Sequence, residues 1–246
     1  MTVPYVVVIP ARFASTRFPG KPLADLGGKS VLMRACERCF EIIDRNSLIV
    51  ATDDERIARH CGDHDVVAVM TSSDHPTGTD RVAEVAGLVD ADWYVNVQGD
   101  EPFLEPEALR AIIEACEIAP PSEMVINASC DIASEDEFRD VTVPKVARTS
   151  EGRLLYISRA AIPTTKALGY AGFARRQVGL YGFRKSALLA FSGHGGKTQL
   201  EALEDIEILR FLELGYAVTM IDVPAGGNAI DTPDDLVAAN EFLKRI

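Results

Sequence analysis

The sequence predicts an α/β protein in which a mainly parallel (mixed) sheet carries helices on both faces. Short β-branched runs alternate with helical patterns through the first half of the chain, at spacings that suit strand–helix–strand crossover units. The 246 residues are enough to bury a large core, and 47% of them are hydrophobic. Neither a low-complexity linker nor an internal repeat separates the two halves, which indicates one continuous domain.

Strands and helices are predicted in turn along the first half. Apolar runs predict strands at residues 5–9, 48–52, 66–70, 93–97 and 124–128. Helical periodicity predicts helices at residues 30–43, 54–61, 79–88 and 105–115. In the second half the order changes, with strands at residues 145–148, 154–158, 177–183 and 217–223 and helices near residues 200–213 and 233–244. We expect this half to add strands to the sheet and to close the binding site.

The balance of charge limits the partners of the protein. Its formal net charge is -12 and its pI is about 4.8, so a nucleic-acid or anionic-membrane surface, which needs a basic face, is not expected. No stretch approaches the ~18 apolar residues of a membrane span. The N-terminus lacks a basic-then-apolar signal segment, and we therefore expect a cytoplasmic protein.

The cysteines do not form a disulfide or metal pattern. A disulfide framework requires an even number of cysteines, and this chain has five. They are Cys36, Cys39, Cys61, Cys116 and Cys130. Cys36 and Cys39 lie in an apolar-periodic run, so we expect them to pack in the core of a helix. His60 and His64 have no third ligand nearby in sequence and are expected at a solvated helix end.

A loop rich in cations follows the first predicted strand. Arg12, Arg17 and Lys21 are the first charged residues of this acidic chain, and the first carboxylate is Asp25. Small residues lie among them: Ala14, Ser15, Thr16 and Gly20. Small side chains let backbone N–H groups approach phosphate oxygens, while Arg and Lys neutralise phosphate charge. The loop therefore predicts a polyphosphate site rather than an ordinary surface loop.

Other phosphate motifs fail. Gly196-Lys197-Thr198 has Phe191 where a Walker A loop requires glycine. No G-x-G-x-x-G follows a predicted strand, which disfavours a dinucleotide fold of the hydride-transfer type.

Acidic and polar residues also follow predicted strands, at the edge where open α/β sheets bind ligands. Asp100 comes directly after an apolar strand, in a glycine turn stopped by Pro102, and is well placed to hold Mg²⁺. Thr52-Asp53-Asp54 and Thr77-Gly78-Thr79 are expected at the same edge. Asp231 could supply a second carboxylate, although N-capping of the helix that follows is the stronger generic explanation.

Seven blocks, in order, carry a resemblance to a known family. They are IPARFASTRFPGKPL, ATDDERIA, DHPTGTDRVAE, VNVQGDEP, YISRAAIP, GLYGFRK and IDTPDDL, from Ile9 to Leu236. Together they resemble the 3-deoxy-manno-octulosonate (Kdo) cytidylyltransferases, or CMP-Kdo synthetases. The resemblance implies a Rossmann-like nucleotidyltransferase fold and a single cytidylyltransferase domain over residues 1–246. Its nucleotide-binding half would span about 1–130, and its sugar-acid and dimerisation half about 131–246.

The same resemblance implies the chemistry. The anomeric hydroxyl of a 2-keto-3-deoxy sugar acid would attack the α-phosphorus of CTP, with Mg²⁺ as cofactor and pyrophosphate as leaving group. Mn²⁺ remains open as an alternative metal. The protein would be a homodimer, and its product CMP-Kdo would feed lipopolysaccharide or capsule biosynthesis.

The resemblance also assigns roles to residues. For CTP it implies Arg12, Ser15, Thr16, Arg17, Lys21, Thr77, Gly78, Thr79, Arg81 and Gln98. For the sugar acid it implies Gln98, Arg159, Gln177, Tyr181 and Glu207. For the metal it implies Asp100 and Asp231. The catalytic set would be Asp100, Lys21, Arg12 and Gln98.

Two residues depart from the family pattern, and two other classes of function remain as alternatives. Gln177 and Ile208 stand where the family usually has His and Gln, so a related or modified ulosonic acid is an alternative acceptor. A metal-dependent glycosyltransferase would usually carry a D-x-D motif, whereas Asp100 is followed by Glu101-Pro102. A non-catalytic nucleotide-binding regulator would be expected to lose a metal carboxylate, and both Asp100 and Asp231 are present.

Overall fold

The computed structural model describes residues 3–15, 17–167, 169–170, 172–227 and 229–245. The strands of its large sheet are β1 (Val3–Ala11), β4 (Leu48–Thr52), β5 (Val67–Met70), β6 (Ala91–Val97), β7 (Val125–Asp131), β8 (Lys145–Arg148), β9 (Leu154–Ser158), β10 (Arg175–Phe183) and β11 (Thr219–Asp222). A separate small hairpin joins β2 (Asp25–Leu26) to β3 (Lys29–Ser30).

The helices lie between and after these strands. They are α1 (Val31–Phe40), α2 (Glu55–Gly62), α3 (Gly78–Leu88), α4 (Pro106–Ile118), α5 (Glu135–Arg139), α6 (Lys185–Gly193), α7 (Gln199–Glu204), α8 (Ile208–Glu213) and α9 (Pro233–Leu243). Two short 3-10 helices, η1 (Lys21–Leu23) and η2 (Arg45–Ser47), precede α1 and β4. No helix in the described part of the chain is both long and apolar enough to cross a lipid bilayer.

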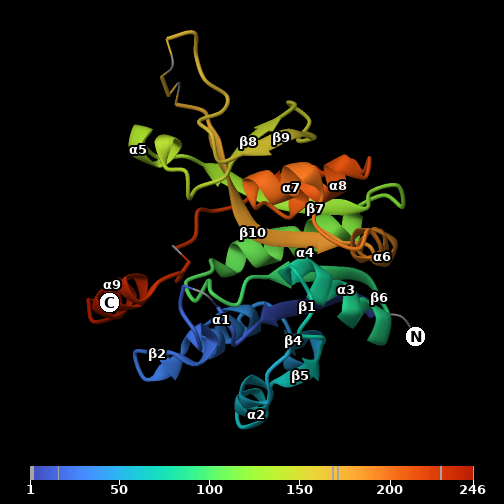
Figure 1. Ribbon diagram of the computed structural model, residues 1–246, viewed down its shortest axis with the longest axis vertical. Helices are drawn as coiled ribbons and strands as arrows, with labels where there is room; N and C mark the ends of the chain where they lie inside the picture. The colour runs from blue at the N-terminus through green and yellow to red at the C-terminus, as the bar shows by residue number, and fades with distance from the viewer. Residues whose placement is uncertain (1–2, 16, 168, 171, 228, 246) are drawn as a thin grey trace.

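The main path of the sheet runs in the order β11-β7-β10-β6-β1-β4-β5 (Figure 1). Parallel pairing joins β6, β1, β4 and β5 at one end of the path and β7 and β11 at the other. Strand β10 is antiparallel to both of its neighbours, β6 and β7, and also pairs with β8. The predicted mainly parallel, mixed sheet is therefore confirmed.

Two hydrophobic cores lie on the two faces of this sheet. Side chains alternate along β1, so that Val7 and Ile9 pack with α1, α2 and α4, while Val6 and Val8 pack with α3, α6 and α8. All four side chains are buried, as expected of a central parallel strand that is covered on both sides. The prediction of helices on both faces is confirmed.

The cysteines and the first helix follow the prediction. Cys36 and Cys39 are fully buried in the core beneath α1, and burial raises the pKa of the Cys39 thiol to about 12. The Ser30 Oγ caps α1 by accepting from the Met33 N–H. His60 differs from the prediction of a solvated residue, because it is half-buried with its Nε2 2.8 Å from the Ser30 Oγ.

One predicted helix is wrong in its continuity. The segment 200–213 forms two helices, α7 and α8, because Asp205 adopts a left-handed conformation with φ 52 between them. Helix α6 was not predicted, since β10 runs directly into Arg184, the N-cap of α6, and the two apolar patterns join. The short helix α5 was also not predicted.

Candidate active site

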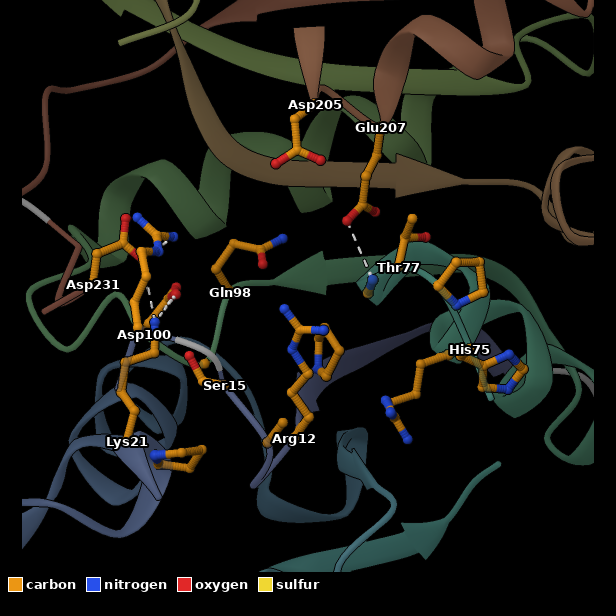
Figure 2. A pocket seen from close by; sticks show the side chains of 18 of the residues that line it. Arg12, Ser15, Lys21, His75, Thr77, Gln98, Asp100, Asp205, Glu207 and Asp231 are labelled. Atoms are coloured by element: carbon orange, nitrogen blue, oxygen red, sulfur yellow. Dashed lines mark hydrogen bonds and ion pairs between the residues drawn. The ribbon is translucent and has the colours of Figure 1, made fainter. Parts of the chain in front are cut away.

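A cavity of about 280 Å³ opens at the carboxyl ends of β1 and β6, which lie side by side in the sheet (Figure 2). Its walls come from the loop after β1, the start of α3, the turn after β6, the region of α7 and α8, and the segment before α9. The lining residues are Pro10, Ala11, Arg12, Ser15, Arg17, Lys21, Pro22, His75, Pro76, Thr77, Gly78, Arg81, Gln98, Gly99, Asp100, Lys197, Asp205, Glu207 and Asp231. Most of the predicted strand-end residues therefore meet in one place.

Four charged residues, Arg17, Lys21, Asp100 and Asp231, form what we call the aspartate–lysine cluster. The Lys21 Nζ donates to the Asp100 Oδ2 at 2.6 Å and to the Asp231 Oδ1 at 3.3 Å. The Arg17 Nη2 also donates to the Asp231 Oδ1, at 3.0 Å. Two carboxylates that are far apart in sequence thus share one ammonium group, whose side chain is only 12% exposed.

The loop after β1 positions Lys21 through a glycine. Gly20 has φ 74, in the left-handed region that favours glycine, and its N–H donates to the Phe13 carbonyl at 2.9 Å. The Arg56 guanidinium stacks 3.4 Å over the Phe13 ring and so holds the other side of this turn. The tight turn starts η1 at Lys21, which places the ammonium beside the carboxylates.

The turn after β6 packs against β1, because a Cβ at Gly99 would lie 3.1 Å from the Ile9 Cγ2 and 3.2 Å from the Pro10 carbonyl oxygen. The backbone carbonyl of Asp100 accepts from the Ile230 N–H at 2.9 Å. This backbone hydrogen bond, together with the one from the Gly227 N–H to the Phe103 carbonyl at 3.3 Å, holds the segment of Asp231 against the turn of Asp100.

The capping explanation for Asp231 is wrong. The N-cap of α9 is Thr232, whose hydroxyl accepts from the Asp235 N–H at 3.2 Å. The Asp235 carboxylate closes the capping box by accepting from the Thr232 N–H. The Asp231 side chain is therefore left to the cavity, where it meets Lys21 and Arg17.

The donor set at this point fits a magnesium ion. Mg²⁺ takes one or two protein carboxylates, with phosphate oxygens and water as its other ligands. Asp100 and Asp231 converge on one cationic group, so they are within reach of a common ion. Among the described residues, no group of three or more His, Cys, Asp and Glu side chains is placed to hold a metal ion. The pair of aspartates would therefore hold Mg²⁺ together with phosphate oxygens and water, and not within a site made of protein ligands alone.

Residues at the start of α3 form another part of the cavity. Thr77 is the N-cap, and its hydroxyl donates to the Asp80 Oδ2 at 2.7 Å. The Arg81 Nη2 donates to the Asp53 Oδ2 at 3.0 Å, and Arg81 also contacts Thr71, so its charge is already paired where it lines the cavity. Asp53 therefore orients Arg81 and does not itself line the cavity.

The opposite side of the cavity carries Lys197, Asp205 and Glu207, which we call the α7–α8 wall. Figure 2 shows Asp205 and Glu207 entering from above and Arg12 and Lys21 from below. The Glu207 carboxylate accepts from the N–H groups of Gly78 at 3.2 Å and Thr79 at 2.8 Å. Burial raises the pKa of Glu207, although these N–H groups act in the other direction.

Strand β10 touches the Asp100 turn at a glycine. A Cβ at Gly179 would clash with the Glu101 Oε1 and would lie 2.8 Å from the Gln98 Cγ. Burial, and then the neighbouring Asp100 carboxylate, raises the pKa of Glu101 to about 7. The glycine therefore lets the turn that carries Gln98 and Asp100 lie directly on the sheet.

Several predicted site residues do not line this cavity. The Thr79 side chain is buried, and its backbone N–H serves Glu207. The Arg159 guanidinium donates to the carbonyl oxygens of Glu204, Asp205, Val141 and Thr142. Their roles, and those of the two β10 residues below, stay predictions. Thr16 lies outside the described residues.

The two β10 residues face neighbouring side chains. The Gln177 Nε2 donates to the Asn127 Oδ1 at 2.9 Å. The Tyr181 ring stacks on Phe183, with 5.7 Å between the ring centroids.

Three charged or titratable lining residues were missed by the sequence reasoning. His75 lies in the block DHPTGTDRVAE, which singled out its neighbours, and its Nε2 contacts the Glu84 carboxylate. Lys197 lies in the Gly-Lys-Thr string that fails as a Walker A loop, and Asp205 had no local signal at all. Asp205 enters the cavity because the chain bends between α7 and α8, and Lys197, which precedes α7, pairs with it there.

A family model described as Cytidylyltransferase matches residues 6–219. A 3-deoxy-manno-octulosonate cytidylyltransferase of Syntrophotalea carbinolica is 40% identical over 245 residues, covering 96% of this chain and 97% of the relative. A protein of the same name from Protochlamydia amoebophila is 38% identical over 249 residues, covering 99% of this chain and 95% of the relative.

Solved structures agree with these relatives. A CMP:2-keto-3-deoxy-manno-octonic acid synthetase complexed with CTP superposes with a TM-score of 0.90 at 32% identity, covering 98% of this chain and 99% of that one. A cytidylyltransferase from Leptospira borgpetersenii has a TM-score of 0.63 at 15% identity, covering 99% of this chain and 94% of that one, a likeness of fold alone.

Proposed function

The chain belongs to the 3-deoxy-manno-octulosonate cytidylyltransferase family, and from this premise we propose that it transfers CMP from CTP to the anomeric hydroxyl of Kdo. The reaction releases pyrophosphate and forms CMP-Kdo. One observation supports the assignment of the site above all. Lys21 contacts both Asp100 and Asp231, so a triphosphate-binding cation and two metal-binding carboxylates meet in one cavity.

Phosphoryl-type transfer depends on positioning and charge neutralisation more than on a covalent partner. Arg12 and Lys21 hold the triphosphate and stabilise the negative charge that builds on the departing pyrophosphate. Ser15 and Arg17 line the same loop and add a hydroxyl and a second guanidinium beside the phosphates. No serine–histidine or cysteine–histidine pair is required for this chemistry.

Asp100 and Asp231 are the residues that would hold Mg²⁺. The chemistry that such an ion supplies when bound is neutralisation of phosphate charge and a lowered pKa for a coordinated hydroxyl group. Activity measured with Mn²⁺ in place of Mg²⁺ would establish which metal serves better. In both cases Asp100→Asn and Asp231→Asn are expected to weaken metal binding.

Thr77, Gly78 and Arg81 receive the cytidine end of CTP, on the side of the cavity formed by α3. Gln98 follows β6 and lies between the aspartate–lysine cluster and the α7–α8 wall, where it orients the reacting groups (Figure 2). In this arrangement residues about 1–130 supply most of the nucleotide site, and residues about 131–246 supply Asp231, the sugar-acid side and the dimer contact. A cytoplasmic homodimer that serves lipopolysaccharide or capsule synthesis is part of the same proposal.

The two departures from the family pattern do not favour a different acceptor. Ile208 is fully buried in the core beneath α8, and Gln177 is paired with Asn127. Neither residue lines the cavity. Kdo is therefore the acceptor that we propose, in agreement with the acceptor in the names of the relatives.

The test is pyrophosphate release from CTP in the presence of Kdo and Mg²⁺. Competing acceptors, namely nonulosonic acids and modified Kdo, are assayed in parallel. Slow turnover of Kdo beside a fast competitor would assign another acceptor. Absence of pyrophosphate release with every acceptor would remove the cytidylyltransferase function, and it is also the result expected of a glycosyltransferase or a non-catalytic regulator.

A further inference from the structure

The bend between α7 and α8 brings Asp205 into the cavity. Asp205 has φ 52, a left-handed conformation that residues other than Gly, Asn and Asp rarely adopt. Unusual backbone conformations of this kind persist only where the surroundings hold them, and they cluster at functional sites.

The surroundings do hold this conformation. The Asp205 N–H donates to the Glu201 carbonyl at 2.8 Å. The Arg159 Nε donates to the Glu204 carbonyl at 2.6 Å, and its Nη2 donates to the Asp205 carbonyl at 3.1 Å. The Glu204 carboxylate in turn accepts from the Ser158 hydroxyl at 2.6 Å and the Arg159 N–H at 2.9 Å. The position of the Asp205 side chain is thus determined by the second half of the chain.

Of the two carboxylates in the α7–α8 wall, Asp205 is the one that faces open space. Both Glu207 oxygens accept from backbone N–H groups of α3. The Asp205 side chain is 72% exposed, and the Lys197 Nζ lies 2.5 Å from its Oδ1. The hydrogen bond from Lys197 lowers the pKa of Asp205, so the group stays an ionised acceptor at neutral pH.

The charged side chains of the cavity indicate where each part of the substrates binds. The anionic triphosphate belongs with Arg12 and Lys21, and the carboxylates of the α7–α8 wall oppose phosphate charge. A neutral, hydroxyl-rich group suits this wall, because a carboxylate accepts hydrogen bonds from neighbouring hydroxyls. Figure 2 shows Asp205 on the other side of the cavity from Asp100, so a sugar acid with its anomeric carbon near Asp100 would have space to extend its farthest carbons toward the α7–α8 wall.

We propose that Asp205 determines specificity by accepting hydrogen bonds from the distal hydroxyl groups of the sugar acid, with Lys197 holding its carboxylate in place. This inference rests on the proposed function and deepens it. It gives a role to a lysine that lies in a failed phosphate motif and to an aspartate that no sequence motif contains.

Two variants separate the carboxylate from the backbone conformation. Asp205→Gly removes the side chain at a position where glycine is unstrained, and Asp205→Asn keeps the shape with a neutral group that tolerates the same φ. We expect the KM for Kdo to rise about 10- to 100-fold in Asp205→Gly, and less in Asp205→Asn, which corresponds to the loss of hydrogen bonds to a charged acceptor. The KM for CTP should stay within about twofold of wild type.

A shorter sugar acid distinguishes a role in specificity from a structural role, because a purely structural effect would not change the preference of the enzyme between the two acids. The wild-type enzyme should disfavour a 2-keto-3-deoxy sugar acid one carbon shorter than Kdo, whereas Asp205→Gly should treat the two acids nearly alike. Asp90→Asn serves as the matched control. Asp90 also pairs with a lysine, Lys185, at 3.4 Å, and it precedes β6 at the end of the strand away from the cavity.

The outcomes separate this inference from the proposed function. Normal wild-type turnover combined with an unchanged KM for Kdo in Asp205→Gly would overturn the role of Asp205 alone. Equal losses on the long and the short acid would also overturn it, because they indicate a structural effect. Absence of wild-type pyrophosphate release would overturn the proposed function and this inference together.

Discussion

The aspartate–lysine cluster and the α7–α8 wall face each other across one cavity, but they are held by different forces. In the cluster, charged side chains that border the cavity pair directly with one another. Arg17 and Asp231 are 65% and 40% exposed, and Lys21 and Asp100 are 12% and 28% exposed. In the wall, Glu207 accepts from backbone N–H groups. Behind it, Arg210 is fully buried and joins Asp80 at 3.0 Å and Glu201 at 2.6 Å.

This difference indicates which ion pairs can be exchanged for contacts with substrates when substrates bind. The exposed pair of Arg17 with Asp231 is worth little. In the less exposed pair of Lys21 with Asp100, phosphate oxygens and a metal ion would give each charge a new partner, so substrates can replace both pairs. A buried ion pair cannot be opened cheaply, because each charge left alone in the core is strongly destabilising. We therefore expect substitutions in the cluster to affect activity, and substitutions behind the wall to affect stability.

The largest effect is expected from Asp100→Asn. Loss of a metal-binding carboxylate should lower turnover at least about a thousandfold, equivalent to ~4 kcal/mol of activation free energy. The melting temperature should stay within about 2 °C of wild type, since the side chain is partly exposed. Pyrophosphate release and calorimetry measure the two quantities, with Asp90→Asn as control. Near-normal turnover would refute the metal assignment.

Arg210→Met tests the other side of the comparison. The change leaves the Asp80 and Glu201 carboxylates buried without their partner, which should lower the free energy of unfolding by about 3 to 5 kcal/mol. Urea denaturation followed by circular dichroism gives this value. The control, Arg110→Met, removes an exposed pair with Glu107 and should cost at most about 1 kcal/mol. A loss as small as that of the control would show that the wall is not held by this pair.

Glu207→Gln tests the contact between the α7–α8 wall and the start of α3, because the Glu207 carboxylate accepts hydrogen bonds from the Gly78 and Thr79 N–H groups. The amide keeps one acceptor oxygen, so we expect kcat/KM for CTP to fall about tenfold, or ~1.4 kcal/mol, and Glu207→Ala to lose more. Steady-state kinetics at varied CTP measure the effect. If the alanine and glutamine variants lost equally, or if only the KM for Kdo changed, Glu207 would not position the start of α3.

The smallest effect is expected from Lys197→Met. The pair with Asp205 is largely exposed, so it should contribute under about 1 kcal/mol to the free energy of unfolding. Because Lys197 lowers the pKa of Asp205 from its ordinary 3.8, this contribution is present above that pH and is lost as the pH falls through the folded pKa. Urea midpoints of both proteins should show a small difference at pH 7 and a smaller difference at pH 3. A difference that grows toward low pH would contradict the assigned pair.

Local patterns in the sequence were enough to predict the scaffold and most of the cluster. The apolar run of β1 predicted a central strand, and the three cations after it predicted a phosphate loop; both Arg12 and Lys21 line the cavity. Asp100 was found because it follows the apolar strand β6. Each of these features lies in the short stretch that follows its own strand, so strand propensity and turn chemistry determine it before any tertiary contact forms.

Only the tertiary structure decided how distant residues meet. Lys21 joins Asp231 across 210 positions of the chain, and Glu207 reaches Thr79 across 128. The left-handed bend at Asp205 depends on Arg159, which occupies the carbonyls at the junction, and local periodicity instead favoured an unbroken helix there. Residue type and spacing thus determined the strands, the cationic loop and the identity of the acids. Packing and long-range hydrogen bonds decided which acids share a cation and which line the other wall, because those contacts depend on geometry that no short stretch of sequence contains.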